Sequence, residues 1–263
     1  MYTLVKTEKK KRLFHTNQVE LSFVIPAYNE EVFIEDTLGT LDLIIKDKRV
    51  QYEIVVVDDG SQDKTFMKAL KYAKRNCHVK VIRYEKNAGK GYAVKTGVMK
   101  ATGDVVIFID GDMEIDLNSL SQYIEALEQA DVVIATKWHP NSVVSMSLNR
   151  KILSRTFNVL VRILIGFNLK DTQVGLKVMK KSAVDKIFPR LAVKRYAFDV
   201  ELLAVAHLYG LKITEMPINL KIASSFKVKE AWRMFVDLLG IAYRLKVIRW
   251  YQRQIYAKKA LQE

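Results

Sequence analysis

Cysteine is almost absent from this chain of 263 residues, since Cys77 is its single cysteine. One thiol can form neither an internal disulfide nor a cysteine-based metal site. The four histidines are scattered, without the spacing of a zinc site. No run of eighteen apolar residues occurs, so we expect no transmembrane helix, and no early segment has the pattern of a signal peptide.

Negative charge is also in short supply, with 29 acidic residues against 43 lysines and arginines and a formal net charge of +14. This balance indicates an anionic partner: nucleic acid, a phosphorylated substrate or an anionic membrane surface. Hydrophobic residues make up 49% of the chain, which suffices for a buried core and excludes global disorder. The length fits one large domain with an appendage, or two small domains.

The most informative stretch is VVIFIDGDME, at residues 105–114. Its continuous apolar run predicts a strand buried on both faces, as in a parallel sheet, where ligands bind at the carboxyl ends of the strands. Three carboxylates follow at that end: Asp110, Asp112 and Glu114. Carboxylates this close repel one another and favour Mg²⁺ or Mn²⁺ shared with substrate phosphates. A solvated acidic turn is the alternative.

Strand and helix patterns alternate before this stretch. We expect strands at 21–25, 52–57 and 79–84, and helices from 34 to 45, 65 to 75 and 92 to 101. Three β-then-α units ahead of the acidic turn predict an α/β fold with a doubly wound, mostly parallel sheet.

Polar turns follow three of these strands, at 26–30, 57–61 and 110–112. Strand ends of one parallel sheet share an edge, so the turns should line one rim. There the ring of Tyr28 could stack on a base, while the carboxylates of Glu30 and Asp59 accept from base N–H and ribose hydroxyl groups. Neither a Walker loop nor a GxGxxG pattern is present, so we expect a metal to hold the phosphates of the nucleotide.

The segments PAYNE, VVDDGSQDKT, NAGKGYAVKTG and FIDGDME resemble the successive motifs of the inverting GT-A glycosyltransferases of family 2. Further on, DTQVGLK at 171–177 and FDVEL at 198–202 resemble the polyprenyl-phosphate sugar synthases within that family. The resemblance implies a basic N-terminal tail at 1–19, a GT-A catalytic domain at 20–225 and C-terminal amphipathic helices at 226–263.

The activity implied by this resemblance is transfer of a hexose, with inversion, from a nucleotide sugar to a polyprenyl (dolichyl) phosphate. The later motifs look more like the glucosyl branch, which favours UDP-glucose as donor, and the mannosyl branch with GDP-mannose is the alternative. A basic nucleic-acid-binding module is the competing class, but the chain has no helix-turn-helix, RRM or zinc pattern. We therefore expect no nucleic-acid partner.

The resemblance also implies roles for individual residues. The nucleotide sugar would be bound by Pro26, Tyr28, Glu30, Val57, Asp58, Asp59 and Gly111. Asp110, Asp112 and Glu114 would serve the metal and diphosphate, and Asp110, Asp112 and Asp199 the catalytic step. The acceptor phosphate would meet Lys137, Arg150, Ser154 and Lys227, although the segment 221–227 departs from the basic segment of many relatives.

Two later segments predict contact with a membrane surface. In 150–167, Lys151, Arg155, Asn158 and Arg162 recur at helical spacing among apolar residues, and 232–256 interleaves aromatic and basic residues. These patterns favour a peripheral protein on the cytoplasmic face of a membrane, and ordinary helices packed on the domain are the alternative. The sequence leaves the oligomeric state open, a homo-oligomer included.

Overall fold

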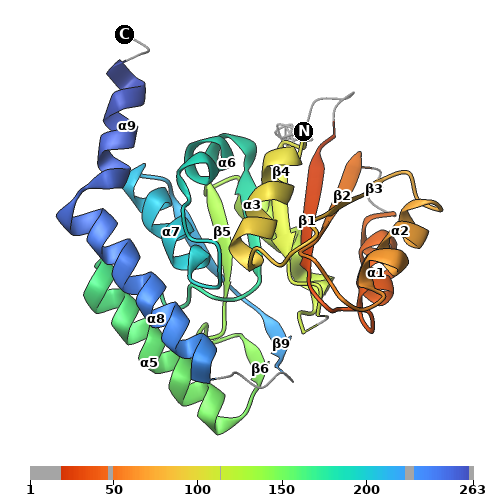
Figure 1. Cartoon of the computed structure of the whole chain (residues 1–263), viewed down its shortest axis with the longest axis horizontal. Coiled ribbons are helices and arrows are strands. Elements are labelled where there is room, and N and C mark those ends of the chain that lie inside the picture. Colours follow the sequence, from red (N-terminus) through yellow and green to blue (C-terminus); the bar gives the residue numbers. More distant parts are fainter. Residues whose placement is uncertain (1–18, 47–49, 113, 223–227, 261–263) are drawn as a thin grey trace, which may run out of the picture.

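The structure, a computed structural model, describes residues 19–46, 50–112, 114–222 and 228–260 (Figure 1). The basic N-terminal tail, apart from its last residue, and Lys227 lie outside the described residues. The strands are β1 (Leu21–Ala27), β2 (Tyr52–Asp58), β3 (Val79–Arg83), β4 (Val105–Ile109), β5 (Val132–Thr136), β6 (Val143–Ser145), β7 (Leu176–Lys180), β8 (Ile213–Pro217) and β9 (Asn219–Lys221).

The α-helices are α1 (Ile34–Lys46), α2 (Thr65–Ala73), α3 (Lys90–Lys100), α4 (Leu120–Ala126), α5 (Leu148–Ile165), α6 (Lys181–Ile187), α7 (Phe198–Leu208), α8 (Val228–Ala242) and α9 (Trp250–Ala260). Two 3-10 helices, η1 (Leu117–Ser119) and η2 (Phe188–Arg190), and a π-helical turn, η3 (Tyr243–Val247), complete the described elements.

A seven-stranded sheet in the order β3-β2-β1-β4-β7-β5-β8 forms the centre of the molecule. Its strand pairs are parallel except where β7 lies between β4 and β5, because β7 runs antiparallel to both. The predicted mostly parallel α/β sheet is confirmed. The reversal arises because the chain leaves β5 through β6 and α5, and returns to the carboxyl end of β4 before β7 begins.

Apolar residues fill both faces of this sheet, as the continuous runs predict. On β4, Val106 and Phe108 belong to a core shared with α3, α5, α6, α7 and α8, whereas Val105, Ile107 and Ile109 face a core with α1, α2 and α4. Strands that bury both faces need helices on both sides, which is the layered architecture seen here (Figure 1).

The first strand is longer than predicted. Proline was expected to end it at Ile25, but β1 continues through Pro26 to Ala27 beside β2. The ladder between β1 and β4 ends at Val24, so the proline, which has no N–H to donate, lies beyond it.

The C-terminal segment packs on helices that cover the central sheet. Met234, Leu238 and Ile241 of α8 lie in the same core as α5 and α7, and the two helices α5 and α8 run side by side (Figure 1). On α5, Asn158 is buried and donates from Nδ2 to the carbonyl of Lys170, so the predicted face of Lys151, Arg155, Asn158 and Arg162 is wrong at this position. None of the helices within the described residues combines the length and the apolar character needed to cross a bilayer.

Candidate active site

The ends of β1, β2 and β4 meet at one edge of the sheet, called the rim below. The backbone N–H of Asp59 donates to the carbonyl of Ala27 over 2.9 Å, which joins the turns after β1 and β2. Asn29, at a positive φ of 58°, donates from its N–H to Ser61 Oγ at 2.9 Å. The predicted sharing of one rim by these turns is confirmed.

Tyr28 and the two aspartates after β2 have different surroundings. The Tyr28 side chain is 43% exposed at the rim and is accessible for stacking on a base. Asp58 is buried and pairs with Arg83 at 3.2 Å. Val57, which precedes it on β2, is buried in the core. Asp59 instead accepts from the N–H groups of Ala88 and Gly89, at 2.7 and 2.8 Å. Asp58 and Val57 therefore form the buried base of the turn. Of these residues, Asp59 is the one whose carboxylate bonds to the neighbouring loop, at Ala88 and Gly89.

Carboxylates crowd together where β4 ends. Burial, followed by the charges of Asp112 and Asp110, raises the pKa of Glu30 to about 7. Burial, followed by the charges of Asp110 and Glu114, raises the pKa of Asp112 to about 6. Gly111 between them is buried, and its carbonyl accepts from Thr37 Oγ1 at 3.1 Å. The pKa values of these carboxyl groups are raised by burial and by one another's charges. A cation bound among them would stabilise their ionised forms.

The oxygen-rich donor set fits a hard divalent ion. In the part of the chain that the structure describes, no three His, Cys, Asp or Glu side chains group closely enough to hold a metal alone. The carboxylates of the acidic turn that could contribute to such a site are Asp110, Asp112 and Glu114.

A lysine that sequence analysis did not assign lies inside this cluster. Lys90 Nζ lies 2.6 Å from Asp110 Oδ1 and 2.8 Å from Oδ2. Burial would lower the pKa of Lys90, but Asp110, Asp199 and Asp112 outweigh it and raise the pKa. Lys90 lies in the NAGKGYAVKTG segment, and its positive charge between two glycines is the signal in the sequence that points to an anionic partner.

Gly175, at the end of the DTQVG stretch, makes room for Asp110. A Cβ on Gly175 would lie 1.8 Å from Asp110 Oδ2, and the Gly175 carbonyl accepts from the N–H of Asp110 at 3.0 Å. Because β7 runs antiparallel to β4, its start lies beside the end of β4. Gly175, just before β7, therefore lies against the carboxylate of Asp110, which pairs with Lys90.

Asp199 lies below the rim in a buried ion pair. Lys177 Nζ of β7 lies 2.6 Å from Asp199 Oδ1, and the two side chains are 1% and 3% exposed. Lys177 also donates to the carbonyl of Val174 at 2.9 Å. Burial raises the pKa of Asp199 and lowers the pKa of Lys177, each against the attraction of the other.

The predicted acceptor contacts are spread over two places. The Lys137 side chain is 7% exposed, and its Nζ pairs with Asp171 at 2.8 Å, so its charge is already neutralised. Arg150 and Ser154 lie one turn apart on α5, where Ser147 caps the helix by accepting from the Arg150 N–H.

Tyr196, before α7, is a second residue that sequence analysis missed. Burial raises its pKa, and the charges that act on it, Glu230, Lys90, Asp110 and Glu30, come from α8, α3 and the rim. With 43% of its side chain exposed, Tyr196 faces solvent between the rim and the start of α8.

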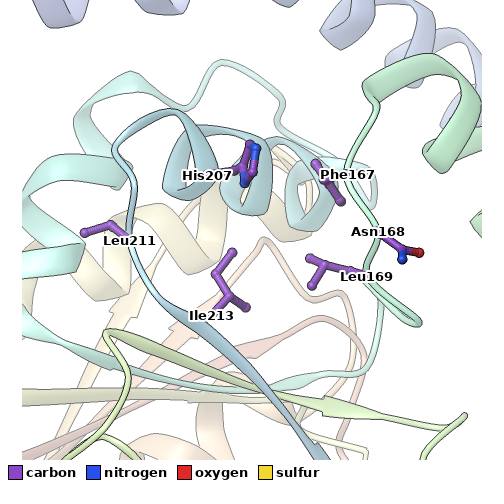
Figure 2. Close-up of a pocket in the computed structure, with 6 residues that line it drawn as sticks. All are labelled: Phe167, Asn168, Leu169, His207, Leu211 and Ile213. Atoms are coloured by element: carbon purple, nitrogen blue, oxygen red, sulfur yellow. The ribbon is translucent and has the colours of Figure 1, made fainter.

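The described residues also enclose a cavity away from the rim and a hollow that borders the acidic turn. A cavity of about 260 Å³ between α7, β8 and the loop after α5 has six lining residues, of which four are apolar and the others are Asn168 and His207 (Figure 2). That lining does not suit a diphosphate. A wider hollow of about 520 Å³ borders Glu114 and is lined by parts of α1, β6 and β9.

A family model described as "Glycosyl transferase family 2" matches residues 22–188 of the chain, a range that includes the strands and turns of the rim. The chain belongs to this family of glycosyltransferases. It is 34% identical over 254 residues to a dolichyl-phosphate beta-glucosyltransferase of Trichomonas vaginalis, covering 90% of this chain and 78% of that protein. The corresponding proteins of Homo sapiens and Saccharomyces cerevisiae are 33% and 31% identical, and the matches cover 89% and 88% of this chain and 78% and 75% of theirs.

Solved structures share the fold. Glucosyl-3-phosphoglycerate synthase from Mycobacterium tuberculosis, in complex with Mn²⁺, UDP and glucosyl-3-phosphoglycerate, superposes with a TM-score of 0.66 at 19% identity, covering 85% of this chain and 80% of that chain. A complex of the same synthase with Mg²⁺ and UDP gives a TM-score of 0.65 at 20% identity, over 85% and 79% of the two chains. The predicted GT-A fold is confirmed.

Proposed function

We propose that this chain transfers glucose from UDP-glucose to a dolichyl or other polyprenyl phosphate, with inversion at the anomeric carbon. The observation that carries the proposal is the cluster of Glu30, Asp110 and Asp112 around Lys90 at the rim, beside an exposed Tyr28. The curated relatives bear the name of this activity, and the solved structures of similar fold contain UDP.

The donor would lie across the rim with its base at Tyr28 and its diphosphate at the acidic turn. Asp110, Asp112 and Glu114 would hold Mg²⁺ or Mn²⁺, which neutralises charge developing on the departing nucleoside diphosphate. Lys90 supplies a second cation at the same place from the chain itself. Pro26 and Gly111 are backbone neighbours there, since the Pro26 carbonyl lies 3.4 Å from where a Cβ on Gly111 would stand.

The acceptor would attack without a strong base. A phosphate monoester has its second pKa at about 6, so it is largely a dianion at neutral pH and already nucleophilic. The task of the protein is then to align that oxygen behind the anomeric carbon. Arg150 and Ser154 of α5 are the proposed phosphate contacts, and Lys137, which is paired with Asp171, is a further candidate.

A lipid acceptor requires the protein to reach a bilayer, and we assign this contact to α5 and α8. Both helices expose apolar residues at helical spacing, called the outer rows below. The rows consist of Leu148, Ile152, Val159 and Ile163 on α5, and Trp232, Val236, Leu239, Tyr243 and Val247 on α8 and η3. Exposed apolar surface of this extent marks an interaction site, and nearby Lys151, Arg155 and Arg233 suit anionic headgroups.

A donor screen tests the proposed reaction. Purified protein is mixed with Mn²⁺, liposomes containing a short polyprenyl phosphate, and radiolabelled UDP-glucose, GDP-mannose or UDP-N-acetylglucosamine. We expect label in the lipid fraction from UDP-glucose, and its loss on adding a chelator. Label from GDP-mannose alone would replace the donor assignment, and label from none of the three would refute the proposed function.

A further inference from the structure

Two lysine–aspartate pairs lie close to one another, a partly exposed pair at the rim and a buried pair below it. Lys177 pairs with Asp199 at 2.6 Å, and Lys90 pairs with Asp110 at 2.6 Å. Gly91, next to Lys90, packs against Phe198, next to Asp199, since a Cβ on Gly91 would lie 2.6 Å from Phe198 Cβ. The backbone therefore brings Lys90 and Asp199 close together, and the charge of Asp199 helps to raise the pKa of Lys90.

Two carboxylates compete for one lysine. If Asp199 were without a partner, it would be a buried, uncompensated anion, and the ammonium group of Lys90 would be drawn from Asp110 toward it. Lys177 removes that competition, because its Nζ is held on Asp199 Oδ1, on the Val174 carbonyl at 2.9 Å and 4.9 Å from the centre of the Phe108 ring. Lys90 is then left on Asp110, where the donor diphosphate would lie.

We propose that Lys177 is a positioning residue for the transfer reaction: by occupying Asp199 it keeps Lys90 at Asp110. Asp199 acts as the partner of Lys177 and not as a general base. This inference rests on the proposed function for its reaction, but its geometry is independent of which sugar is transferred. The buried setting supports it, since the side chains of the pair are 1% and 3% exposed.

Four proteins test the inference: wild type, Lys177→Met, Asp199→Asn and the double variant. In Lys177→Met, Lys90 is expected to shift toward Asp199, so kcat falls about 100-fold while KM for the donor changes little. Affinity for UDP, whose full charge resembles the departing group, falls about tenfold by calorimetry with Mn²⁺ present. In the double variant no competing carboxylate remains, and both kcat and the affinity for UDP return to within about threefold of wild type.

The matched control uses the same strand. Lys180, at the exposed end of β7, pairs with Asp131 at 3.5 Å, and both side chains are about one third exposed. Lys180→Met with Asp131→Asn repeats the chemistry away from the rim, and it should leave kcat and UDP affinity unchanged. Thermal unfolding of all variants, with kcat normalised to UDP-binding sites, separates a loss of folded protein from a loss of rate.

The outcomes are distinguishable. A double variant that regains thermal stability but keeps a kcat about 100-fold below wild type would indicate that Asp199 is itself needed, as a base would be, and would overturn the inference. Unchanged UDP affinity and kcat in Lys177→Met would overturn it as well. If wild type transfers no sugar, the proposed function fails, and the UDP titrations then decide the role of Lys177 by themselves.

Discussion

Asp110 can occupy its position only because Gly175 has no side chain. Gly175→Ala would bring a Cβ within 1.8 Å of Asp110 Oδ2 and push that carboxylate away from Lys90. A displacement of this size in a catalytic site lowers the rate by about 100-fold, and we expect that loss in the transfer assay. The control is Gly39→Ala on α1, where a Cβ meets nothing within 4 Å, and full activity is expected. Full activity of Gly175→Ala would show that Asp110 does not need this position.

Glu53, on β2, makes stability depend on acid. Burial would raise its pKa, but bonds from Lys80, the Thr102 N–H and Ser22 lower it from 4.5 to about 2. Because the folded pKa is depressed, this stabilisation is complete above pH 4.5 and is lost as pH falls toward 2. We expect Glu53→Gln to lose about 2–3 kcal/mol of unfolding free energy at pH 7, less what solvent screens at the exposed Lys80.

Urea unfolding at several pH values measures this effect. The difference between wild type and Glu53→Gln should shrink steadily below pH 4.5. Lys180→Met, which removes an exposed ion-pair partner on β7, is the control and should stay within about 0.5 kcal/mol of wild type. A constant difference at all pH values would mean that the carboxylate charge contributes nothing.

Residue identities along the rim could be predicted because turns after buried strands have few possible locations. Glu30, Asp59, Asp110 and Asp112 do gather there. Lys90 and Lys177 could not be assigned, because their partners come from β4 and α7, which are distant in sequence. Spacing along one chain does not show which lysine will neutralise which carboxylate.

At the scale of elements, hydrogen bonds to Glu201 of α7 connect the C-terminal segment with the loop that precedes α7. Glu201 accepts from the N–H groups of Ala192 and Val193 at 2.9 and 2.7 Å, and from the hydroxyl of Tyr251. Arg244 Nε donates to that same hydroxyl at 3.0 Å. The loop after Val193 in turn accepts from α3, since the Lys194 carbonyl receives the N–H of Tyr92. Packing of α9 is thus linked to the helix that carries Lys90.

Tyr251→Phe tests this link by removing one hydroxyl and leaving the buried carboxylate with fewer donors. We expect unfolding free energy to drop by about 1–3 kcal/mol, with a smaller loss of transfer activity. Tyr243→Phe is the matched control, because Tyr243 is 54% exposed on η3. Equal stability of the two variants in urea would exclude the proposed link.

Elements were more predictable than their connections. The strands and helices before residue 115 lie where apolar periodicity predicts them, within a few residues. The start of α3 was missed, because Gly89, at a φ of 105°, lets the helix begin at Lys90, two residues before the predicted position. The direction of β7 could not be read from its apolar residues, since a buried strand looks the same in either direction.

At the scale of the whole molecule, the outer rows of α5 and α8 predict how the protein meets a bilayer. Each buried CH₂ contributes about 0.8 kcal/mol, and each basic residue near an anionic surface about 1 kcal/mol. Salt screens only the second contribution, so binding to anionic liposomes should weaken with salt without vanishing. Sedimentation with liposomes measures this.

Charged substitutions in the outer rows identify the contact. Ile163→Glu with Val247→Glu should reduce liposome binding about tenfold or more, because two carboxylates would enter an apolar layer. Leu43→Glu is the control, since Leu43 is 74% exposed on α1, at the other end of the molecule in Figure 1. Equal binding of both proteins would move the contact elsewhere.

The place of β7 in the sheet also bears on the order in which the chain can fold during synthesis. β1 to β4 can pair as soon as they emerge, but β5 joins them only through β7, which is made more than forty residues later. That central strand carries Lys177, whose charge is costly to bury until α7 brings Asp199. The strands on either side of β7 can therefore join into one sheet only after residue 199 has been synthesised, when Asp199 can pair with Lys177.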